Sequence, residues 1–299
     1  MSESTIALDG VFPPIPTPFG MEENVAYQAL IENIERWNHY RLAGYVILGS
    51  NGEMVYLSDE EKVRIWETAR QAIPSDRLLI AGTGCESTRQ TIRLSRQAAD
   101  AGADAVLVLT PHYYDGLMTA EALTHHFRAI AEASPVPVIL YNMPRFTNVD
   151  MDAATVADIA RHPNVAGIKD SGGNVGKLAQ IVRTVGPDLQ VLAGSASFFL
   201  PALAVGAVGV VAALANVAPQ RVIDLYDRFK AGRLDEAASI QQELIASNTA
   251  VTARFGIPGL KAALDMLGYY GGPVRSPLRP LSDHKIQTLK SILVEGGIV

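Results

Sequence analysis

Cysteine and basic charge are scarce in this chain of 299 residues. Cys85 is the only cysteine, which excludes an internal disulfide and is compatible with a reducing compartment. The formal net charge of -6 at pH 7 leaves no basic excess for a nucleic-acid surface, so we expect no nucleic-acid partner. Residues 1–6 contain neither a charged segment nor a long apolar run, so we expect no secretory signal and a cytoplasmic protein.

Signatures of several other chemistries are also missing. There is no His-Glu-x-x-His zinc motif, and the adjacent His125 and His126 would face different directions on a helix. No Gly-x-x-x-x-Gly-Lys-Ser/Thr phosphate loop and no Gly-x-Ser-x-Gly nucleophile elbow occurs. We therefore expect no metal and no organic cofactor.

A membrane span is not expected either. The longest apolar stretch, residues 198–217, is interrupted by Pro201 and by glycines, and its second half is rich in β-branched residues. This pattern favours a buried helix followed by a buried strand.

Short apolar runs recur along the first two thirds of the chain. The eight runs are residues 11–15, 45–48, 78–81, 105–108, 136–140, 165–168, 189–193 and 208–211. Amphipathic helical segments lie between them, at residues 25–42, 59–72, 87–101, 119–133, 152–161, 175–185 and 197–204. Runs this apolar are typical of strands buried on both faces. Their alternation with helices predicts an α/β fold, a (β/α)₈ TIM barrel.

The alternative to a barrel is a doubly wound sheet. It is disfavoured because no Gly-x-Gly-x-x-Gly follows the first predicted strand. After residue 218 only helices are predicted, at residues 221–231, 235–252, 259–267 and 283–293. We therefore predict a barrel over residues 1–232 and a C-terminal helical region, residues 233–299, packed on it.

Lysine is rare, and one lysine has unusual surroundings. Of seven lysines, Lys62, Lys177, Lys230, Lys285 and Lys290 have polar neighbours and are predicted on surface helices, and Lys261 opens an apolar helical run. Lys169 alone follows a buried strand and precedes a glycine-rich turn. An ammonium group there is poorly solvated, which favours the neutral, nucleophilic amine. The alternative is a lysine that merely pairs with a carboxylate.

Polar residues follow the other predicted strands. They are Thr17, Gly49 to Glu53, Thr83, Thr110 to Tyr114, Tyr141 to Pro144, Lys169 to Ser171 and Gly194 to Ser197. In a barrel these positions meet at one mouth, where the active site lies. A lysine, a tyrosine, hydroxyls and glycine-flanked amides suit imine formation with a carbonyl substrate. The tyrosine can move protons, and the amides and hydroxyls can bind a carboxylate.

Each part of this constellation also has a structural interpretation. Tyr141 could be a core aromatic residue, and Gly49-Ser-Asn-Gly52 could be a plain turn. The Gly194-Ser195 pair could cap the next helix. Tyr113 and Tyr114 could form an exposed interface patch, and Cys85 a half-buried structural thiol.

Five motifs occur in order along essentially the whole chain. They are Gly49-Ser-Asn-Gly-Glu53, Thr110-Pro-x-Tyr113, Tyr141-Asn-x-Pro144, Gly167-Ile-Lys169-Asp-Ser171 and Ala193-Gly194. Together they resemble the dihydrodipicolinate synthase / N-acetylneuraminate lyase family of class I, pyruvate-dependent aldolases. The resemblance implies a (β/α)₈ barrel with a C-terminal helical region, assembled as a homotetramer, a dimer of dimers.

The resemblance also implies catalytic roles. Lys169 would form the Schiff base with the substrate, and Tyr141 beside it would relay protons. Ser50 would pass protons as well, and Tyr113 would reach into the site of a neighbouring subunit.

Substrate-binding roles follow by the same resemblance. Ser50 and Asn51 would hold the carboxylate of the oxo acid. Ser171 and Gly194 would line the pocket.

One departure bears on the substrate. In dihydrodipicolinate synthases an arginine follows Tyr-Asn-x-Pro-x, but here that position is Phe146 and Arg145 comes one residue earlier. The stretches 82–88, 169–173, 212–217, 254–261 and 268–273 instead resemble the 4-hydroxy-2-oxoglutarate aldolases. We therefore expect cleavage of 4-hydroxy-2-oxoglutarate to pyruvate and glyoxylate. The alternatives are 4-hydroxy-tetrahydrodipicolinate synthesis, a 2-keto-3-deoxy sugar acid aldolase or dehydratase, and a non-catalytic pyruvate-binding barrel.

Overall fold

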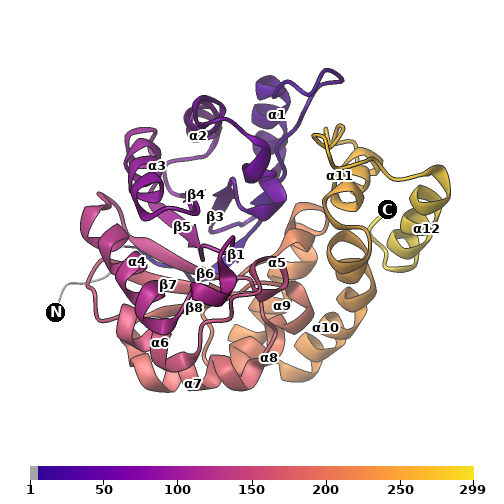
Figure 1. Cartoon of the computed structure of the whole chain (residues 1–299). Coiled ribbons are helices and arrows are strands. Elements are labelled where there is room, and N and C mark those ends of the chain that lie inside the picture. Colours follow the sequence, from indigo (N-terminus) through magenta and orange to yellow (C-terminus); the bar gives the residue numbers. More distant parts are fainter. Residues whose placement is uncertain (1–5) are drawn as a thin grey trace.

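Every strand in the computed structural model, which describes residues 6–299, runs parallel to its neighbours in one sheet. The strands are β1 (Gly10–Phe12), β2 (Pro14–Ile15), β3 (Gly44–Ile47), β4 (Leu78–Gly82), β5 (Ala105–Leu109), β6 (Val138–Asn142), β7 (Val165–Asp170), β8 (Gln190–Ala193) and β9 (Gly209–Val211). Their order is β1-β9-β8-β7-β6-β5-β4-β3-β2, and β1 and β2 are consecutive in the chain. The sheet therefore closes on itself, and the predicted (β/α)₈ barrel is confirmed (Figure 1).

The first barrel strand is divided at Pro13, so the prediction of one continuous strand over residues 11–15 was wrong in this detail. Gly10–Phe12 pairs with β9, and Pro14–Ile15 pairs with β3. Proline has no N–H to donate to a sheet ladder. The Pro13 carbonyl still accepts from the Val46 amide at 3.0 Å, and the Val11 carbonyl accepts from Ala43 at 3.1 Å. These two bonds keep the barrel closed across the break.

Helices follow most strands and surround the barrel. They are α1 (Tyr27–Trp37), α2 (Asp59–Ala72), α3 (Thr88–Asp100), α4 (Ala120–Ala133), α5 (Pro144–Thr147), α6 (Ala153–Ile159), α7 (Val175–Val185), α8 (Phe199–Ala204), α9 (Pro219–Lys230), α10 (Leu234–Thr249), α11 (Gly256–Met266) and α12 (Asp283–Glu295). Two of them, α2 and α7, have the predicted bounds. The short helix α5 was not predicted.

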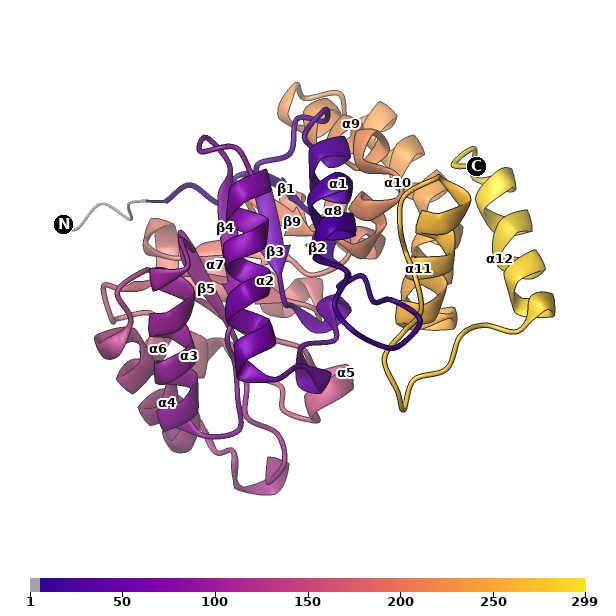
Figure 2. The same cartoon turned by 90° about the horizontal axis from the view of Figure 1, so that it is seen from above.

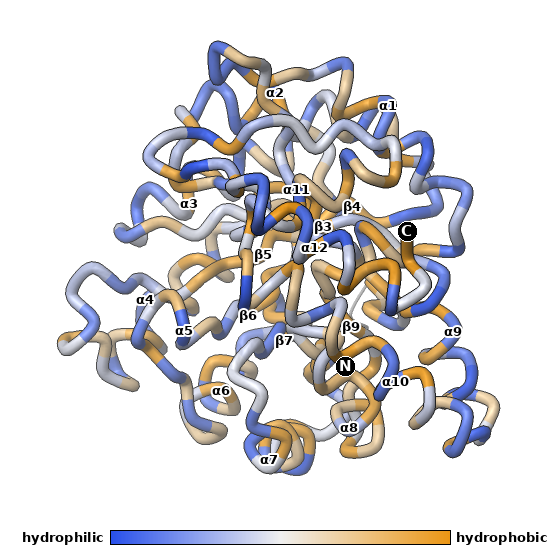
Figure 3. The backbone as a smooth tube through the Cα atoms, turned by 90° about the vertical axis from the view of Figure 1, so that its right-hand side faces the viewer, coloured by the Kyte–Doolittle hydropathy of each residue, from blue (hydrophilic) through white to orange (hydrophobic). Residues whose placement is uncertain are grey.

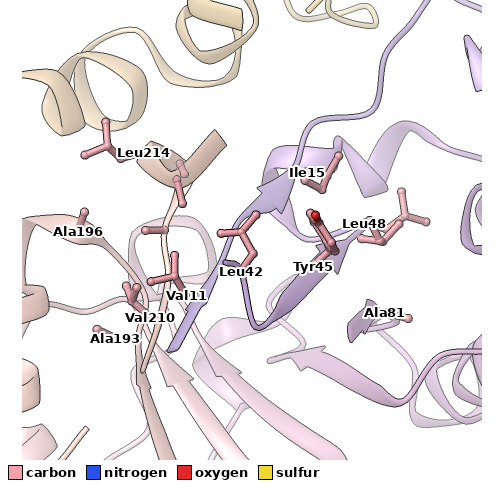
Figure 4. Packing of buried hydrophobic residues seen from close by; sticks show 14 of the residues in the cluster. Val11, Ile15, Leu42, Tyr45, Leu48, Ala81, Ala193, Ala196, Val210 and Leu214 are labelled. Atoms are coloured by element: carbon pink, nitrogen blue, oxygen red, sulfur yellow. The ribbon is translucent and has the colours of Figure 1, made fainter. Parts of the chain in front are cut away.

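Two apolar layers stabilise the barrel. The inner layer fills the space enclosed by the strands and includes Phe12, Ile80, Leu107 and Tyr141. The outer layer joins the strands to the helices, and Figure 4 shows the part of it near the closing strands. In Figure 3 the outer helices change between blue and orange along their length. This is expected of helices that bury one side only.

The apolar stretch at residues 198–217 folds as predicted into a helix followed by a strand. Strand β9 is buried throughout, whereas α8 buries only Phe199, Ala202 and Leu203. Within residues 6–299, no helix is long and apolar enough to cross a membrane. The expectation about a secretory signal rests on residues 1–6, of which 1–5 lie outside the described part of the chain.

The helices α10 to α12 lie along one side of the barrel (Figures 1 and 2). The Gln241 side chain of α10 donates to the Ala196 carbonyl and accepts from the Leu200 amide, at 2.8 and 2.9 Å. After α11 the chain runs beside α1, where the Asn33 amide exchanges two hydrogen bonds with the backbone of Tyr270. The C-terminal region thus contacts both an early and a late segment of the barrel. The predicted boundary between the barrel and this region, at residue 232, stays a prediction.

Candidate active site

Lys169 and Tyr141 lie side by side at the carboxyl ends of neighbouring strands. They are register partners on β7 and β6. Ile168 faces the outer layer, so the alternation along a strand turns Lys169 towards the barrel interior, where Tyr141 also lies. The Lys169 side chain is only 4 % exposed, and its Nζ lies 3.9 Å from the centre of the Tyr141 ring. The lysine is therefore enclosed at the barrel mouth.

A hydrogen bond joins this pair to the loop after β3. The Ser50 hydroxyl and the Tyr141 hydroxyl are 3.2 Å apart, and either can donate. Ser50 and Asn51 belong to a 3₁₀ turn, η1 (Ser50–Gly52). The Thr17 hydroxyl donates to the Gly52 carbonyl at 2.6 Å and ties this turn to the first barrel strand. A proton can thus pass between the tyrosine and the serine.

The ends of β7 and β8 approach so closely that only glycine fits at position 194. A Cβ there would lie 1.9 Å from the Ser171 Oγ and 2.7 Å from the Asp170 carbonyl oxygen. The Gly194 amide donates to that carbonyl at 2.7 Å. This close approach is a physical reason for glycine at this position.

These groups line a cavity of about 310 Å³. Six of the predicted site residues border it, namely Ser50, Asn51, Tyr141, Lys169, Ser171 and Gly194. A larger groove between α4 and α6 is lined by neither lysine nor tyrosine and lies away from the strand ends. The enclosed cavity is therefore the candidate active site.

Tyr113 is the predicted site residue that the single chain does not bring to the cavity. Its side chain is 76 % exposed, and its ring packs edge-on against Tyr114 with the centroids 5.0 Å apart. The backbone amides of His112 and Tyr113 both donate to Glu86, at 2.9 Å each, which holds this loop outward. Tyr113 can act in a site only if that site belongs to another subunit.

One wall of the cavity comes from the C-terminal region, and nothing in the local sequence pattern indicated it. Asn248 and Thr252 lie at the end of α10 and in the π-helical turn that follows it, η7 (Ala250–Arg254). Arg145 of α5 also borders the cavity, and its guanidinium donates to the Ala253 carbonyl at 3.2 Å. Among the described lining residues Lys169 and Arg145 are the basic ones, and none is acidic. The cavity is therefore suited to an anion.

A buried ionic network lies next to the reactive lysine. Asp170 is fully buried, and its carboxylate accepts from Lys177 Nζ and from the Asn142 amide, both at 2.8 Å. Asp150 also accepts from Asn142 and Lys177. Burial opposes the charged form of Lys177, but the hydrogen bonds to Asp150 and Asp170 outweigh it and raise the pKa of Lys177. The network fixes the ends of β6 and β7 relative to each other.

Three of the other lysines are buried, and two of these had been predicted on the surface. Lys62 and Lys177, predicted on surface helices, pair with Asp59 and with Asp150 and Asp170, and Lys261 pairs with Glu53. For Lys177 the prediction was wrong because the polarity of sequence neighbours does not reveal carboxylates that packing brings from other elements. For Lys62, whose partner lies three residues away on α2, it does not reveal that Gln90 and Arg93 of α3 pack over this part of the helix. Lys169 stays distinct because it borders the cavity.

Other candidate groups have structural surroundings. Cys85 is half-buried, and burial raises the pKa of its thiol, which leaves it in the less nucleophilic protonated form. His126 is buried in α4 with its Nδ1 2.8 Å from the Thr88 hydroxyl. Residues 6–299 contain no group of three or more His, Cys, Asp or Glu side chains arranged to hold a metal ion.

The fold and the site together define a (β/α)₈-barrel enzyme with an enclosed lysine. The model of the dihydrodipicolinate synthetase family matches residues 7–295, and the chain belongs to this family. Its members are class I Schiff-base lyases, so the protein is an enzyme of that class.

Relatives with different names are equally similar. A probable mitochondrial 4-hydroxy-2-oxoglutarate aldolase of Emericella nidulans is 36% identical over 292 residues, covering 96% of this chain and 94% of the relative. A 4-hydroxy-tetrahydrodipicolinate synthase of Methanothrix thermoacetophila is 36% identical over 287 residues, covering 96% of each. The crystal structure of dihydrodipicolinate synthase from Acinetobacter baumannii, complexed with pyruvate, superposes with a TM-score of 0.93 at 30% identity, covering 98% of this chain and 100% of that chain. Overall similarity thus establishes the family but does not distinguish between substrates. The substrate has to be inferred from the residues of the site.

Proposed function

We propose that the protein cleaves a 4-hydroxy-2-oxo acid to pyruvate and an aldehyde through an imine at Lys169. One observation carries the proposal, namely the enclosed Lys169 Nζ, 3.9 Å from the ring of Tyr141, whose hydroxyl lies 3.2 Å from Ser50. A lysine amine adds to a ketone, and the protonated imine then withdraws electrons from the adjacent carbons. A tyrosine–serine pair at the same mouth can move the protons that this chemistry requires.

The proposed reaction requires neither a metal nor an organic cofactor. The Lys169 amine attacks C2 of the substrate, and water leaves as the protonated imine forms. Tyr141 takes the proton of the C4 hydroxyl, the C3–C4 bond breaks and its electron pair enters the enamine. The aldehyde departs, C3 is protonated, and water hydrolyses the imine to pyruvate and the free amine.

The charge of the cavity favours a substrate with two carboxylates. Ser50 and Asn51 would hold the carboxylate next to the imine carbon. Arg145 borders the same cavity, which has no acidic lining residue in the described part of the chain. A guanidinium is well suited to a second carboxylate. 4-Hydroxy-2-oxoglutarate, which would release glyoxylate, has both groups and is our preferred substrate.

Two other enzymatic reactions keep Lys169 and change the second substrate. Synthesis of 4-hydroxy-tetrahydrodipicolinate from pyruvate and aspartate semialdehyde is supported by the names of several relatives. A 2-keto-3-deoxy sugar acid with a single carboxylate would leave Arg145 without an anionic partner. A non-catalytic pyruvate-binding barrel would lack the lysine or the tyrosine, and both are present here.

A substrate panel separates these reactions. Pyruvate release is measured from 4-hydroxy-2-oxoglutarate and from 2-keto-3-deoxy sugar acids, and condensation is measured with aspartate semialdehyde. The highest kcat/KM is expected for 4-hydroxy-2-oxoglutarate. Faster turnover of aspartate semialdehyde would contradict the preferred substrate, and pyruvate binding without any turnover would contradict an enzymatic function.

We also propose a cytoplasmic homotetramer, a dimer of dimers, in which the partner subunit's Tyr113 completes the proton path. The outward position of the loop before α4 supports this proposal. Tyr113, Tyr114 and Leu117 expose large apolar side chains there. Such a patch is typical of a subunit contact.

A further inference from the structure

A buried ion pair connects the catalytic loop to the C-terminal region. Glu53 ends the turn that carries Ser50 and Asn51, and Lys261 lies in α11, more than two hundred residues later. Lys261 Nζ is 2.6 Å from Glu53 Oε1, and each residue is only 1 % exposed. Neither group is needed for the chemical steps described above.

Further contacts hold the same loop from the same side. The Arg275 amide donates to Glu53 Oε2 at 2.9 Å, and its guanidinium donates to the Tyr56 carbonyl at 2.9 Å. The same guanidinium pairs with both oxygens of Glu61, which belongs to the capping box at the start of α2. Lys261 also donates to the Pro273 carbonyl at 2.8 Å. The segment from Glu53 to Glu61 is thus clamped by α11 and the chain that follows it.

A short path leads from this ion pair to the reacting groups. The Glu53 amide donates to the Ser50 carbonyl at 3.2 Å, and Ser50 in turn contacts the Tyr141 hydroxyl. Glu53 adopts a left-handed conformation, with φ of 54°, which is unfavourable for a residue with a side chain. Outside contacts must therefore hold the turn in this shape.

A gain in folding stability alone does not explain why Glu53 and Lys261 form a fully buried ion pair. Desolvation of both charges offsets most of their attraction, so an apolar pair of similar volume is often as stable. What such a pair adds is a fixed orientation of the two side chains, because the carboxylate must point at the ammonium. A shift of about 1 Å in a catalytic group can lower a rate about 100-fold, so the orientation of the turn that carries Ser50 matters for the rate.

We propose that Glu53 and Lys261 are positioning residues, which set the Ser50 hydroxyl against Tyr141 and so make the C-terminal region part of the catalytic apparatus. This inference rests on the proposed Schiff-base function. It predicts that the pair acts on the rate through Ser50 and not through Lys169.

The test is a double-mutant cycle. Glu53→Gln and Lys261→Met are each made in the wild-type chain and in a Ser50→Ala background. In the wild-type background each is expected to lower kcat about 10- to 100-fold, with a smaller change in KM and with the pyruvate adduct of Lys169 still formed. In the Ser50→Ala background the same substitutions should change kcat by less than about 3-fold, because they act through the group already removed.

Lys62→Met is the matched control. Lys62 is also a buried lysine with one carboxylate partner, Asp59, 3.3 Å away on α2, and it does not border the cavity. It should lower the melting temperature while leaving kcat within about 2-fold of wild type. Should Lys261→Met not fold, Glu53→Gln and the double variant Glu53→Gln/Lys261→Met, which leaves no buried charge unpaired, complete the cycle.

The outcomes separate the two proposals. Equal kcat losses in both backgrounds, or a lower melting temperature with unchanged kcat, would overturn the positioning role. A wild-type chain that forms no pyruvate adduct would overturn the proposed function and this inference with it.

Discussion

At the scale of single residues, Tyr141 combines two roles that one substitution separates. Its ring lies under Lys169 and its hydroxyl meets Ser50. Tyr141→Phe keeps the ring and removes the hydroxyl, so the site should keep its shape and lose the proton path. We expect kcat to fall about 100- to 10,000-fold, as for other general acid–base groups.

The readout for Tyr141→Phe is single-turnover cleavage beside a measurement of pyruvate binding. Binding and the melting temperature should change little. A kcat within a factor of two of wild type would show that another group moves the proton.

Arg145 carries the prediction about substrate charge. Arg145→Ala should lower kcat/KM for 4-hydroxy-2-oxoglutarate about 10- to 100-fold, because a charged hydrogen bond to the second carboxylate is lost. Turnover of 4-hydroxy-2-oxopentanoate, which has a methyl group in place of that carboxylate, should not change.

Arg254→Ala is the control for this charge effect. Arg254 lies next in sequence to the Ala253 that Arg145 contacts. Like Arg145 it is exposed, but it does not border the cavity. Equal losses for both substrates in Arg145→Ala, or equal losses in the two arginine variants, would contradict a direct carboxylate contact.

Site residues were predictable where the strand pattern determined their position. The ends of β3, β6, β7 and β8 meet at one mouth, so Ser50, Tyr141, Lys169 and Gly194 came together as expected. The cavity wall from Asn248 and Thr252 was not predictable, because it depends on how α10 packs on the barrel. The buried partners of Lys177 and Lys261 were missed because they too depend on how separate elements pack together.

At the scale of elements, the helices were predicted best where a capping signal accompanied the apolar period. The Ser58 hydroxyl accepts from the Glu61 amide at 3.2 Å and the Glu61 carboxylate accepts from the Ser58 amide at 2.9 Å, which forms a capping box at the start of α2. The division of the first strand had a local signal in Pro13, which cannot donate to a sheet ladder, and the prediction of one strand did not use it. The π-helical turn after α10 is a product of tertiary packing.

The contact between α3 and α4 predicts a pH-dependent stability. Burial lowers the pKa of His126 to about 4 from its ordinary value of 6.5. Below pH 6.5 His126 binds a proton in the unfolded chain but not in the folded chain. The contribution of neutral His126 to the free energy of unfolding is therefore present above pH 6.5 and is lost as the pH falls towards 4. Between pH 7 and pH 5 the loss should be about 2 kcal/mol.

Urea unfolding at the two pH values tests this contribution. His126→Gln, which can keep a hydrogen bond to Thr88, should show a pH dependence smaller by about that amount. His125→Gln is the control, since His125 is the exposed neighbour on the same helix. A pH dependence that both variants share with wild type would contradict the assignment to His126.

At the scale of the whole molecule, the position of Tyr113 predicts activity shared between subunits. Lys169→Ala and Tyr113→Ala chains should each be inactive or nearly so. When they are mixed, denatured and refolded together, the Tyr113→Ala chain keeps Lys169 and receives the partner subunit's Tyr113. Random pairing should restore roughly one site in four.

Activity of the mixture, corrected for each chain refolded alone, is the measurement. No recovery in a mixture that forms mixed oligomers by native mass spectrometry would show that Tyr113 does not act across a subunit contact. High activity of Tyr113→Ala alone would show that it is not catalytic.

The central claim is that Lys169 forms the imine. The most direct test is borohydride reduction of the wild-type protein with pyruvate, followed by peptide mapping of the mass adduct. The account predicts one adduct per chain, on Lys169, and none in Lys169→Ala. An unmodified wild-type chain, or an adduct on Lys177 or Lys261, would contradict it.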